Sequence, residues 1–194
     1  MSAHPFAELL KWFPDHCDSE SLDLMYRHWQ LVLQWNARTN LTAIKSDQEA
    51  LLRHYADSLV MAEHLPSAGR VLDVGSGGGF PGIPLAIVRQ DLDWVLLEPR
   101  KKRVSFLQMV KARLQLSNVE VVNGRSDQEM THICDAAVTR ATFSDEAGAR
   151  SVMDWVKPGG YLLALRSLDA ESWQETDQIE SGFGSHVRRI DRLR

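Results

Sequence analysis

Apolar side chains recur at helical spacing twice in the first seventy residues. In the first stretch, about 20–36, the apolar positions are Leu22, Met25, Trp29, Val32 and Leu33. In the second, about 47–65, they are Leu52, Tyr55, Leu59, Ala62 and Leu65. Repeats of three and four residues predict amphipathic helices. A polar connection over 36–42 separates the two, so the chain is predicted to begin with a helical segment.

From Arg70 the pattern changes to short apolar runs that alternate with helical patterns. The predicted strands are Arg70–Val74, Asp93–Glu98, Val119–Val122, Ala136–Thr139 and Tyr161–Leu165. The predicted helices are Ile83–Arg89, Lys101–Leu116 and Ala147–Val156, and Pro158-Gly159-Gly160 is predicted to form a tight turn. Strands alternating with helices indicate the α/β class, with a mostly parallel sheet covered on both faces. The polar segment from Glu171 onward leaves room for a closing hairpin.

The chain has 194 residues, of which 44% are hydrophobic and 25% charged, and this composition fits one domain. We expect residues 1–68 to form a helical segment packed on a core of residues 69–194, in a single compact unit. No apolar run reaches the roughly 18–20 residues that span a membrane, and no signal-peptide pattern begins the chain, so we expect a cytoplasmic protein. Cys17, Cys134 and the seven histidines show no metal-ligand spacing, so no metal site is predicted.

Charge is unevenly distributed along the chain. The net charge is −4 with a pI near 6.0, which does not indicate an indiscriminate nucleic-acid binder. Residues 71–125 nevertheless carry eight basic and five acidic side chains, whereas the segments on either side are net negative. This local excess of basic charge fits a polyanion that is held at one place.

A glycine-dense turn follows the first predicted strand. The strand continues through Asp73 and Val74 into Gly75, and the run up to Gly82 contains five glycines. Glycine permits positive φ and lets a ligand approach main-chain N–H groups closely. Pro81 is suited to open the following helix. The pattern predicts a nucleotide-sized ligand at the carboxyl end of a strand.

Two carboxylates indicate which ligand this turn binds. The run 77–82 satisfies the dinucleotide pattern GxGxxG, so an NAD-binding fold has to be considered. Asp73, however, stands directly before the glycines, where a carboxylate attracts an ammonium group and repels a pyrophosphate. Glu98 ends the next predicted strand, where it can accept both ribose hydroxyls. The pair favours S-adenosylmethionine over NAD, although a turn-capping Asp73 and a solvated Glu98 remain an alternative.

With its longer motifs, the chain resembles the bacterial small-subunit rRNA 7-methylguanosine methyltransferases of the RsmG group, also called glucose-inhibited division protein B (GidB). The motifs are Trp35-Asn36, Asn40-Leu41-Thr42-Ala43-Ile44, Arg53-His54, Asp57-Ser58-Leu59, Asp73 to Ala86, Lys102-Arg103, Phe106-Leu107, Gly124-Arg125 and Thr139-Arg140-Ala141. The resemblance covers about 30–166, and its most specific part is Phe80 to Ala86. It implies a Rossmann-like class I S-adenosylmethionine-dependent methyltransferase that methylates N7 of a guanine in 16S rRNA of the small ribosomal subunit.

The resemblance also implies roles for individual residues. Asp73 would lie behind the amino group of S-adenosylmethionine, and Glu98 would hold its ribose. The remaining cofactor-binding residues would be Gly75, Ser76, Gly77, Gly79, Phe80, Ser126, Asp127 and Arg140. Arg140 would also position the guanine as the catalytic residue. The RNA-binding residues would be Arg100, Lys101, Lys102, Arg103, Arg125 and Arg166. The family commonly has Asp in place of Glu98, Ser in place of Thr139, and Lys-Gly in place of Arg166-Ser167.

The expected chemistry needs no general base, because guanine N7 carries a free lone pair. An exocyclic-amine methyltransferase would favour an Asn/Asp-Pro-Pro-aromatic tetrapeptide, which the sequence lacks. A C5-pyrimidine enzyme would need a nucleophilic cysteine, and Cys134 is better explained as a buried structural thiol. His54 and Asp57 could contact substrate or form a bond on the helix surface. The tryptophans, Trp35 among them, favour packing over base stacking.

Alternatives from other classes remain open at this point. The same fold could methylate another RNA or a ribosomal protein, or the chain could be a non-catalytic S-adenosylmethionine-binding module. An NAD-dependent oxidoreductase would need a hydride-transfer residue and usually a substrate domain, and the sequence offers neither. The low pI favours a structured ribosomal particle over naked RNA as the partner, and a monomer is favoured.

Overall fold

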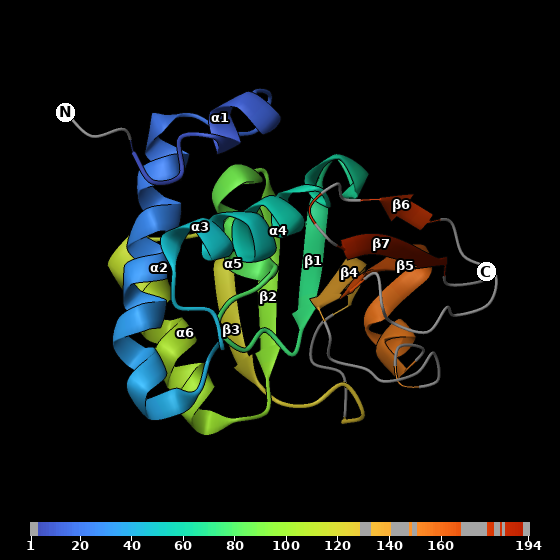
Figure 1. Cartoon of the computed structure of the whole chain (residues 1–194). Helices are drawn as coiled ribbons and strands as arrows, with labels where there is room; N and C mark the ends of the chain where they lie inside the picture. Colours follow the sequence, from blue (N-terminus) through green and yellow to red (C-terminus); the bar gives the residue numbers. More distant parts are fainter. Residues whose placement is uncertain are drawn as a thin grey trace.

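A seven-stranded sheet forms the centre of the computed structural model, which describes residues 4–128, 133–140, 148, 151–167, 178–180, 183 and 185–191. The strand order is β3-β2-β1-β4-β5-β7-β6 (Figure 1). The strands are β1 (Gly69–Val74), β2 (Leu92–Glu98), β3 (Val119–Asn123), β4 (Cys134–Arg140), β5 (Val156–Ser167), β6 (Gln178–Glu180) and β7 (Ser185–Asp191). All five predicted strands are therefore confirmed, although β5 begins five residues before its predicted start.

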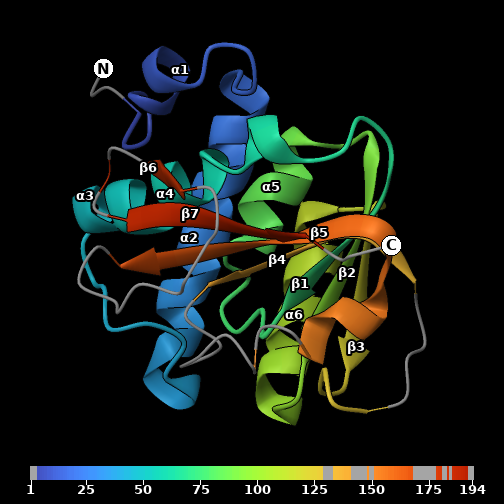
Figure 2. The same cartoon turned by 90° about the vertical axis from the view of Figure 1, so that its right-hand side faces the viewer.

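Strand pairing creates a switch point in the middle of the sheet. The pairs from β3 to β5 are all parallel, whereas β7 pairs antiparallel with both β5 and β6. Figure 2 shows β5, β7 and β6 next to one another, with β6 at the edge, and this is the hairpin that the C-terminal segment allowed. From β1 the chain winds outward to β2 and β3, then returns to the other side of β1 as β4. Ligands of open α/β sheets bind at the carboxyl ends of strands at such a point.

The first helical stretch forms one long helix. α1 (Leu9–Trp12) precedes α2 (Ser19–Thr39), which confirms the helix predicted over 20–36. The Asp18 side chain accepts a hydrogen bond from the Ser21 N–H, and the Ser21 hydroxyl is bonded to the Asp18 N–H in return. This reciprocal cap fixes where α2 begins. The helix ends where Asn40 adopts a left-handed φ of 48°.

The second helical stretch is not the single regular helix that the spacing predicted. It is divided into α3 (Asp47–Ala50), the π-helical turn η1 (Leu51–Ala56), α4 (Asp57–Leu59) and the 3₁₀ turn η2 (Ala62–His64). The wider π turn lets consecutive side chains point inward, and all six residues from His54 to Leu59 are buried. A 3.6-residue period cannot anticipate that run.

The core lies on both faces of the sheet, as predicted. Side chains alternate along the strands: Trp94 and Leu96 of β2 pack with the helices, whereas Val95 and Leu97 pack on the opposite face. α2, α5 (Gly82–Val88) and α6 (Lys101–Leu114) cover the first face. Val152 and Trp155 of the 3₁₀ turn η3 (Ser151–Trp155) pack on the second.

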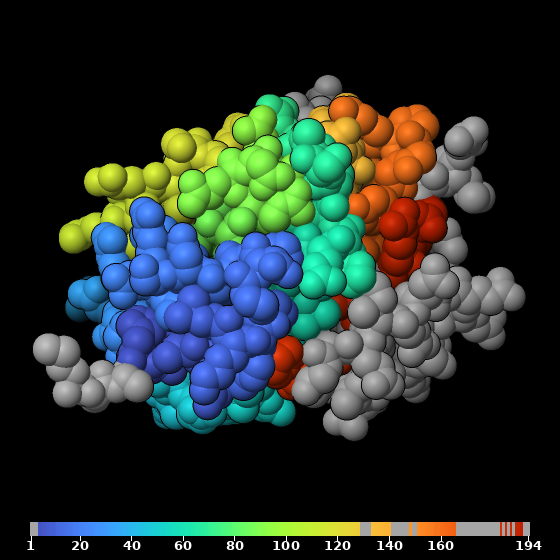
Figure 3. All heavy atoms as spheres, turned by 90° about the horizontal axis from the view of Figure 1, so that it is seen from above, coloured from blue at the N-terminus to red at the C-terminus, as the bar shows by residue number. Residues whose placement is uncertain are grey.

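The N-terminal helices and the sheet share one buried cluster. It joins apolar side chains of α2 and η1 to those of α5, α6 and the strands. Figure 3, a view from above, shows the blue N-terminal residues directly against the teal and green residues that follow them. The division into residues 1–68 and 69–194 stays a prediction.

The segment before Tyr161 differs from the predicted turn. Pro158, Gly159 and Gly160 lie inside β5, where the register against β4 shifts between Cys134 and Ala136. Gly159 adopts a φ of 82°, which a bulged strand accommodates through glycine. The helix predicted over Ala147–Val156 falls partly outside the described residues, and within them Ser151–Trp155 is a 3₁₀ turn and Val156 already belongs to β5.

Neither a membrane span nor a metal site is evident in the described part of the chain. No helix among those residues is both long and apolar enough to cross a bilayer. The same residues contain no group of three or more histidine, cysteine or acidic side chains that could hold a metal ion. Both cysteines are buried and free, which agrees with structural thiols.

Candidate functional site

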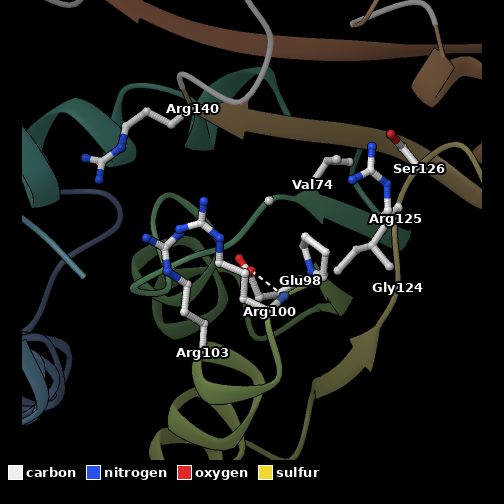
Figure 4. Close-up of a pocket in the computed structure, with 11 residues that line it drawn as sticks. Val74, Glu98, Arg100, Arg103, Gly124, Arg125, Ser126 and Arg140 are labelled. Atoms are coloured by element: carbon white, nitrogen blue, oxygen red, sulfur yellow. Dashed lines mark hydrogen bonds between the residues drawn. The ribbon is translucent and has the colours of Figure 1, made fainter. Parts of the chain in front are cut away.

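A cavity of about 460 Å³ opens at the carboxyl ends of the central strands (Figure 4). It is lined by Val74, Gly75, Leu97, Glu98, Pro99, Arg100, Arg103, Gly124, Arg125, Ser126 and Arg140. These residues come from the ends of β1, β2 and β4, the loop after β3, and the start of α6. The cavity therefore lies at the switch point of the sheet.

The glycine loop that follows β1 reaches this cavity through Gly75. Gly75, Gly77 and Gly79 adopt φ values of 72°, 56° and 91°, which side chains with a Cβ rarely tolerate. The Gly75 N–H donates to the Leu97 carbonyl at 2.8 Å, which ties the loop to the end of β2. A Cβ on Gly79 would come within 2.6 Å of Ile83, so this position also lacks the space for one.

Glu98 links the glycine loop to the start of α6. One carboxylate oxygen accepts a hydrogen bond from the Gly77 N–H and the other from the Arg100 N–H, both at 2.9 Å. The side chain is buried but lines the cavity. Two backbone donors thus hold the carboxylate in place at the end of β2, where the sequence predicted a ribose ligand.

Asp73 lies beneath the loop and does not line the cavity. Its Oδ2 accepts from the Gly82 N–H at 3.1 Å, whereas its Oδ1 is buried and has no partner among the residues that the structure describes. Burial raises the pKa of this carboxyl to about 7, against the opposing hydrogen bonds from Ser76 and Gly82. An unpartnered buried oxygen of this kind calls for a donor.

Arg140 is held by the N-terminal helices. Its Nη1 donates to the Arg53 carbonyl at 3.0 Å and to His54 Nδ1 at 2.7 Å, and its guanidinium lies 5.0 Å from the centre of the Phe80 ring. Burial lowers the pKa of Arg140 to about 10, an effect opposed by the Asp57 carboxylate, so the side chain stays cationic at neutral pH. Figure 4 shows the guanidinium directed away from Ser126 and Arg125.

His54 is a neutral acceptor for this arginine. Arginine only donates, so Nδ1 must accept and Nε2–H must donate to the Thr42 hydroxyl at 2.8 Å. Burial and the charge of Arg140 lower the pKa of His54 to about 2. Its ring stacks on Phe80 with centroids 4.2 Å apart. Of the two sequence interpretations of His54, a contact on the helix surface is wrong, because the side chain is buried beside Arg140.

His28 is a site residue that sequence reasoning missed. Its Nε2–H donates to the Gly78 carbonyl at 3.0 Å, and its Nδ1 accepts from the Tyr55 hydroxyl at 2.9 Å. Burial lowers its pKa to about 3, so it is neutral. The available signal was a histidine between Met25 and Trp29 on the apolar face of the first predicted helix, where a polar side chain requires a partner.

The remaining predicted residues divide into two groups. Arg100, Arg103, Arg125 and Ser126 line the cavity together with Gly75, Glu98 and Arg140. Those outside its lining are Asp73, Ser76, Gly77, Gly79, Phe80, Lys101, Lys102 and Asp127, whereas the side chain of Arg166 falls outside what the structure describes. Asp127 forms an ion pair with Arg125 at 3.0 Å, and the backbone of Arg166 pairs with His186 in β7.

Comparisons with known proteins agree with the motifs. The family model described as rRNA small subunit methyltransferase G matches residues 21–189. The ribosomal RNA small subunit methyltransferase G of Clostridium novyi is 34% identical over 172 residues, which cover 83% of this chain and 71% of that protein. Its counterpart from Alkaliphilus metalliredigens is 37% identical over 158 residues, covering 78% and 66%.

Solved structures support the fold. A crystal structure of a SAM-dependent methyltransferase from Aquifex aeolicus superposes with a TM-score of 0.61 at 17% identity, covering 74% of this chain and 93% of that one. The Rossmann-like class I methyltransferase fold is thereby confirmed, and so is the resemblance carried by the sequence motifs. The chain belongs to the rRNA small subunit methyltransferase G family.

Proposed function

We propose that this protein transfers a methyl group from S-adenosylmethionine to N7 of a guanine in 16S rRNA of the small ribosomal subunit. Membership of the rRNA small subunit methyltransferase G family carries this proposal. The position of the cavity supports it, since the opening lies where open α/β sheets bind nucleotides.

The residues around the cavity fit S-adenosylmethionine. Its volume of about 460 Å³ is within the usual range for small-molecule sites. Glu98 offers a fixed carboxylate for ribose hydroxyls, and Gly75 allows close approach to the backbone. The buried Oδ1 of Asp73 lacks a donor in the described structure, and an ammonium group behind the loop would supply one. Ser126 would flank the adenine, with Asp127 beside it on the same loop.

When bound, S-adenosylmethionine supplies an electrophilic methyl group on a sulfonium. The protein needs no base at N7, so its contribution is alignment and exclusion of water, which can supply roughly 7–11 kcal/mol. Arg140 borders the cavity as a cation and is the residue that we assign to the guanine. Arg100, Arg103 and Arg125 would hold RNA phosphates around the opening, and we assign Lys101, Lys102 and Arg166 to the same RNA backbone.

The partner that we propose is a ribosomal particle in the bacterial cytoplasm. A net charge of −4 gives the protein little general attraction for RNA, so the shape of the assembled small subunit would provide much of the affinity. We propose that the protein acts as a monomer and without a metal ion.

Methyl transfer to defined particles tests the proposal. The purified protein is incubated with methyl-labelled S-adenosylmethionine and small subunits that lack the modification, and the label is then mapped. We expect label at one guanine as 7-methylguanosine. Arg140→Ala should abolish turnover and retain cofactor binding, which separates an enzyme from a binding module. Label on a ribosomal protein, or none despite cofactor binding, would contradict the proposal.

A further inference from the structure

A second cavity lies between the end of α2 and the start of α6. It has a volume of about 620 Å³, and its lining includes Trp35, Arg38 and Thr39 of α2 with Lys102 and Ser105 of α6. The two helices pack against each other along the sheet, as Figure 1 shows. We call this cavity the Trp35 groove.

Three hydrogen bonds of the Asn36 side chain shape the chain that follows α2 beside the groove. The Asn36 side chain accepts from the Leu41 and Thr42 N–H groups and donates to the Thr42 carbonyl, at 2.6, 3.0 and 2.7 Å. These bonds fold the chain back after α2 and leave Asn40 at the turn. Three hydrogen bonds to one amide make this end of the helix rigid.

Arg103 lies between the end of α2 and the first cavity. Its Nη2 donates to the Asn40 carbonyl at 3.1 Å, and the same side chain lines the proposed cofactor cavity. Lys102 lines the groove and is its neighbour in sequence. Consecutive residues at the start of α6 thus line the two cavities, Lys102 the groove and Arg103 the proposed cofactor cavity.

The chemistry of the groove suits single-stranded nucleic acid. Trp35 is partly exposed, and its ring lies 5.6 Å from that of Phe106, which supports it from within the core. The charged residues in the described lining, Arg38 and Lys102, are both cationic and exposed. Proteins bind single strands with an aromatic platform for a base and cations for the adjacent phosphates.

We propose that the Trp35 groove binds an unpaired nucleotide of the RNA substrate, whose base stacks on Trp35 while its phosphates meet Arg38 and Lys102. The proposal rests on the proposed function, since it assigns a second contact to the same substrate. It assigns base stacking to Trp35, for which the sequence favoured packing, and it places Lys102 of α6 and Arg38 of α2 on the same phosphates.

Binding of a short fluorescein-labelled single-stranded RNA to the full chain tests the groove. Trp35→Ala should lower the affinity for this RNA about tenfold, because it removes the aromatic ring on which one base stacks. The double variant Arg38→Ala/Lys102→Ala should also weaken binding, and should reduce the slope of log affinity against log salt by about 1.4, or about 0.7 per cation. RNA should quench tryptophan fluorescence in the wild type and less in Trp35→Phe, which keeps an aromatic ring against Phe106.

Matched controls separate the groove from general effects. Arg113→Ala removes a cation from the far end of α6, and Trp12→Ala removes an exposed tryptophan of α1; both should keep wild-type RNA affinity. Cofactor affinity and the melting temperature report whether Trp35→Ala is folded. If it is not, Trp35→Phe and the double cation variant decide.

Each outcome supports or overturns the proposal that the Trp35 groove binds RNA. Unchanged RNA affinity and quenching in the Trp35 variants would overturn it. The proposal would also be overturned if the variants lost affinity for intact small subunits but not for free RNA, because the groove would then contact a ribosomal protein. Failure of the wild type to label any rRNA guanine would count against the proposed function, whereas loss of RNA affinity in the groove variants would still support the groove.

Discussion

The glycine loop over residues 75–80 has two unlike sides. On one side Gly75 lines the open cavity and the Gly77 N–H meets the Glu98 carboxylate. On the other side the Gly78 carbonyl accepts from His28, and Phe80 stacks on His54 within the core. The first side carries the Glu98 carboxylate and borders the cavity, whereas the second packs against neutral histidine and tyrosine rings, with the Arg140 cation bonded to one of them. We therefore expect changes on the first side to alter ligand affinity, and changes on the second to alter stability.

The neutrality of the buried side has a physical cause. Burial lowers the pKa of His28 to about 3 and that of His54 to about 2, so both rings are uncharged near neutral pH. Each ring nitrogen then has a defined role as donor or acceptor. The loop is thus held from behind by bonds that do not depend on the ligand.

Removal of His28 should give the largest effect on stability. His28→Leu leaves the Gly78 carbonyl and the Tyr55 hydroxyl without their partner, and unsatisfied buried groups cost about 1–3 kcal/mol each. We expect the free energy of unfolding to fall by about 3 kcal/mol, measured by urea denaturation. Cofactor affinity of the folded fraction should fall less than tenfold. Tyr55→Phe, which loses only one of the two bonds, should cost about 1 kcal/mol. Equal losses in the two variants would contradict the role of the Gly78 bond.

Glu98 should show the opposite balance. Glu98→Gln keeps the size of the side chain but removes its charge, and bonds to charged groups contribute about 1.5–3 kcal/mol. Gln has only one acceptor oxygen, so either the Gly77 or the Arg100 N–H loses its partner. We expect the Kd for S-adenosylmethionine, measured by calorimetry, to rise about 30-fold while the free energy of unfolding falls by about 1 kcal/mol. Glu98→Asp, which keeps the charge, should retain most of the affinity. A loss of stability larger than the loss of affinity would end the distinction between the two sides.

The open side could be predicted from the sequence because its signals are local. Glycines, Asp73 and Glu98 stand at fixed distances from strand ends, and parallel strands bring those ends to one edge. The lining of the cavity by Gly75 and Glu98 followed from that rule, whereas Ser126 was expected only from the family resemblance.

The buried side could not be predicted in the same way. His28 and Gly78 are fifty residues apart, and their contact depends on how α2 packs on the sheet. The π turn at Leu51–Ala56 also breaks the helical period that predicted which side chains point inward. The turn predicted over Pro158-Gly159-Gly160 was wrong for a related reason. Such a run predicts a turn unless the partner strand is known, and here it pairs within β5 as a bulge.

Asp73 lies between the two sides, and pH should reveal its charge. With its pKa raised to about 7, the carboxyl is mostly neutral at pH 6 and mostly ionised at pH 8. An ammonium group favours the ionised form, so cofactor affinity should rise by up to about tenfold over this range. Asp73→Asn should bind more weakly and without this dependence.

The same ionisation should affect stability with the opposite sign. The folded state of Asp73 holds a proton between about pH 4 and 7 that the unfolded state has released, so its contribution is present below pH 4 and lost as pH rises through 7. Without cofactor, the wild type should lose stability relative to Asp73→Asn over this interval, measured by urea denaturation. Parallel curves for the two proteins would contradict a raised pKa.

Thr42 should give the smallest effect, because it acts on Arg140 only through His54. Its hydroxyl accepts from His54 Nε2–H at 2.8 Å and from the Ile44 N–H at 3.1 Å. Thr42→Val keeps the shape and removes both acceptors, so we expect a loss of about 1 kcal/mol in urea denaturation. Thr42→Ser retains the hydroxyl and should therefore keep most of the wild-type free energy of unfolding. Cofactor affinity should stay within about twofold in both variants, since neither His54 nor Thr42 lines the cavity. A drop in affinity in Thr42→Val alone would instead mean that the buried rings and the open cavity are one coupled unit, connected through Arg140.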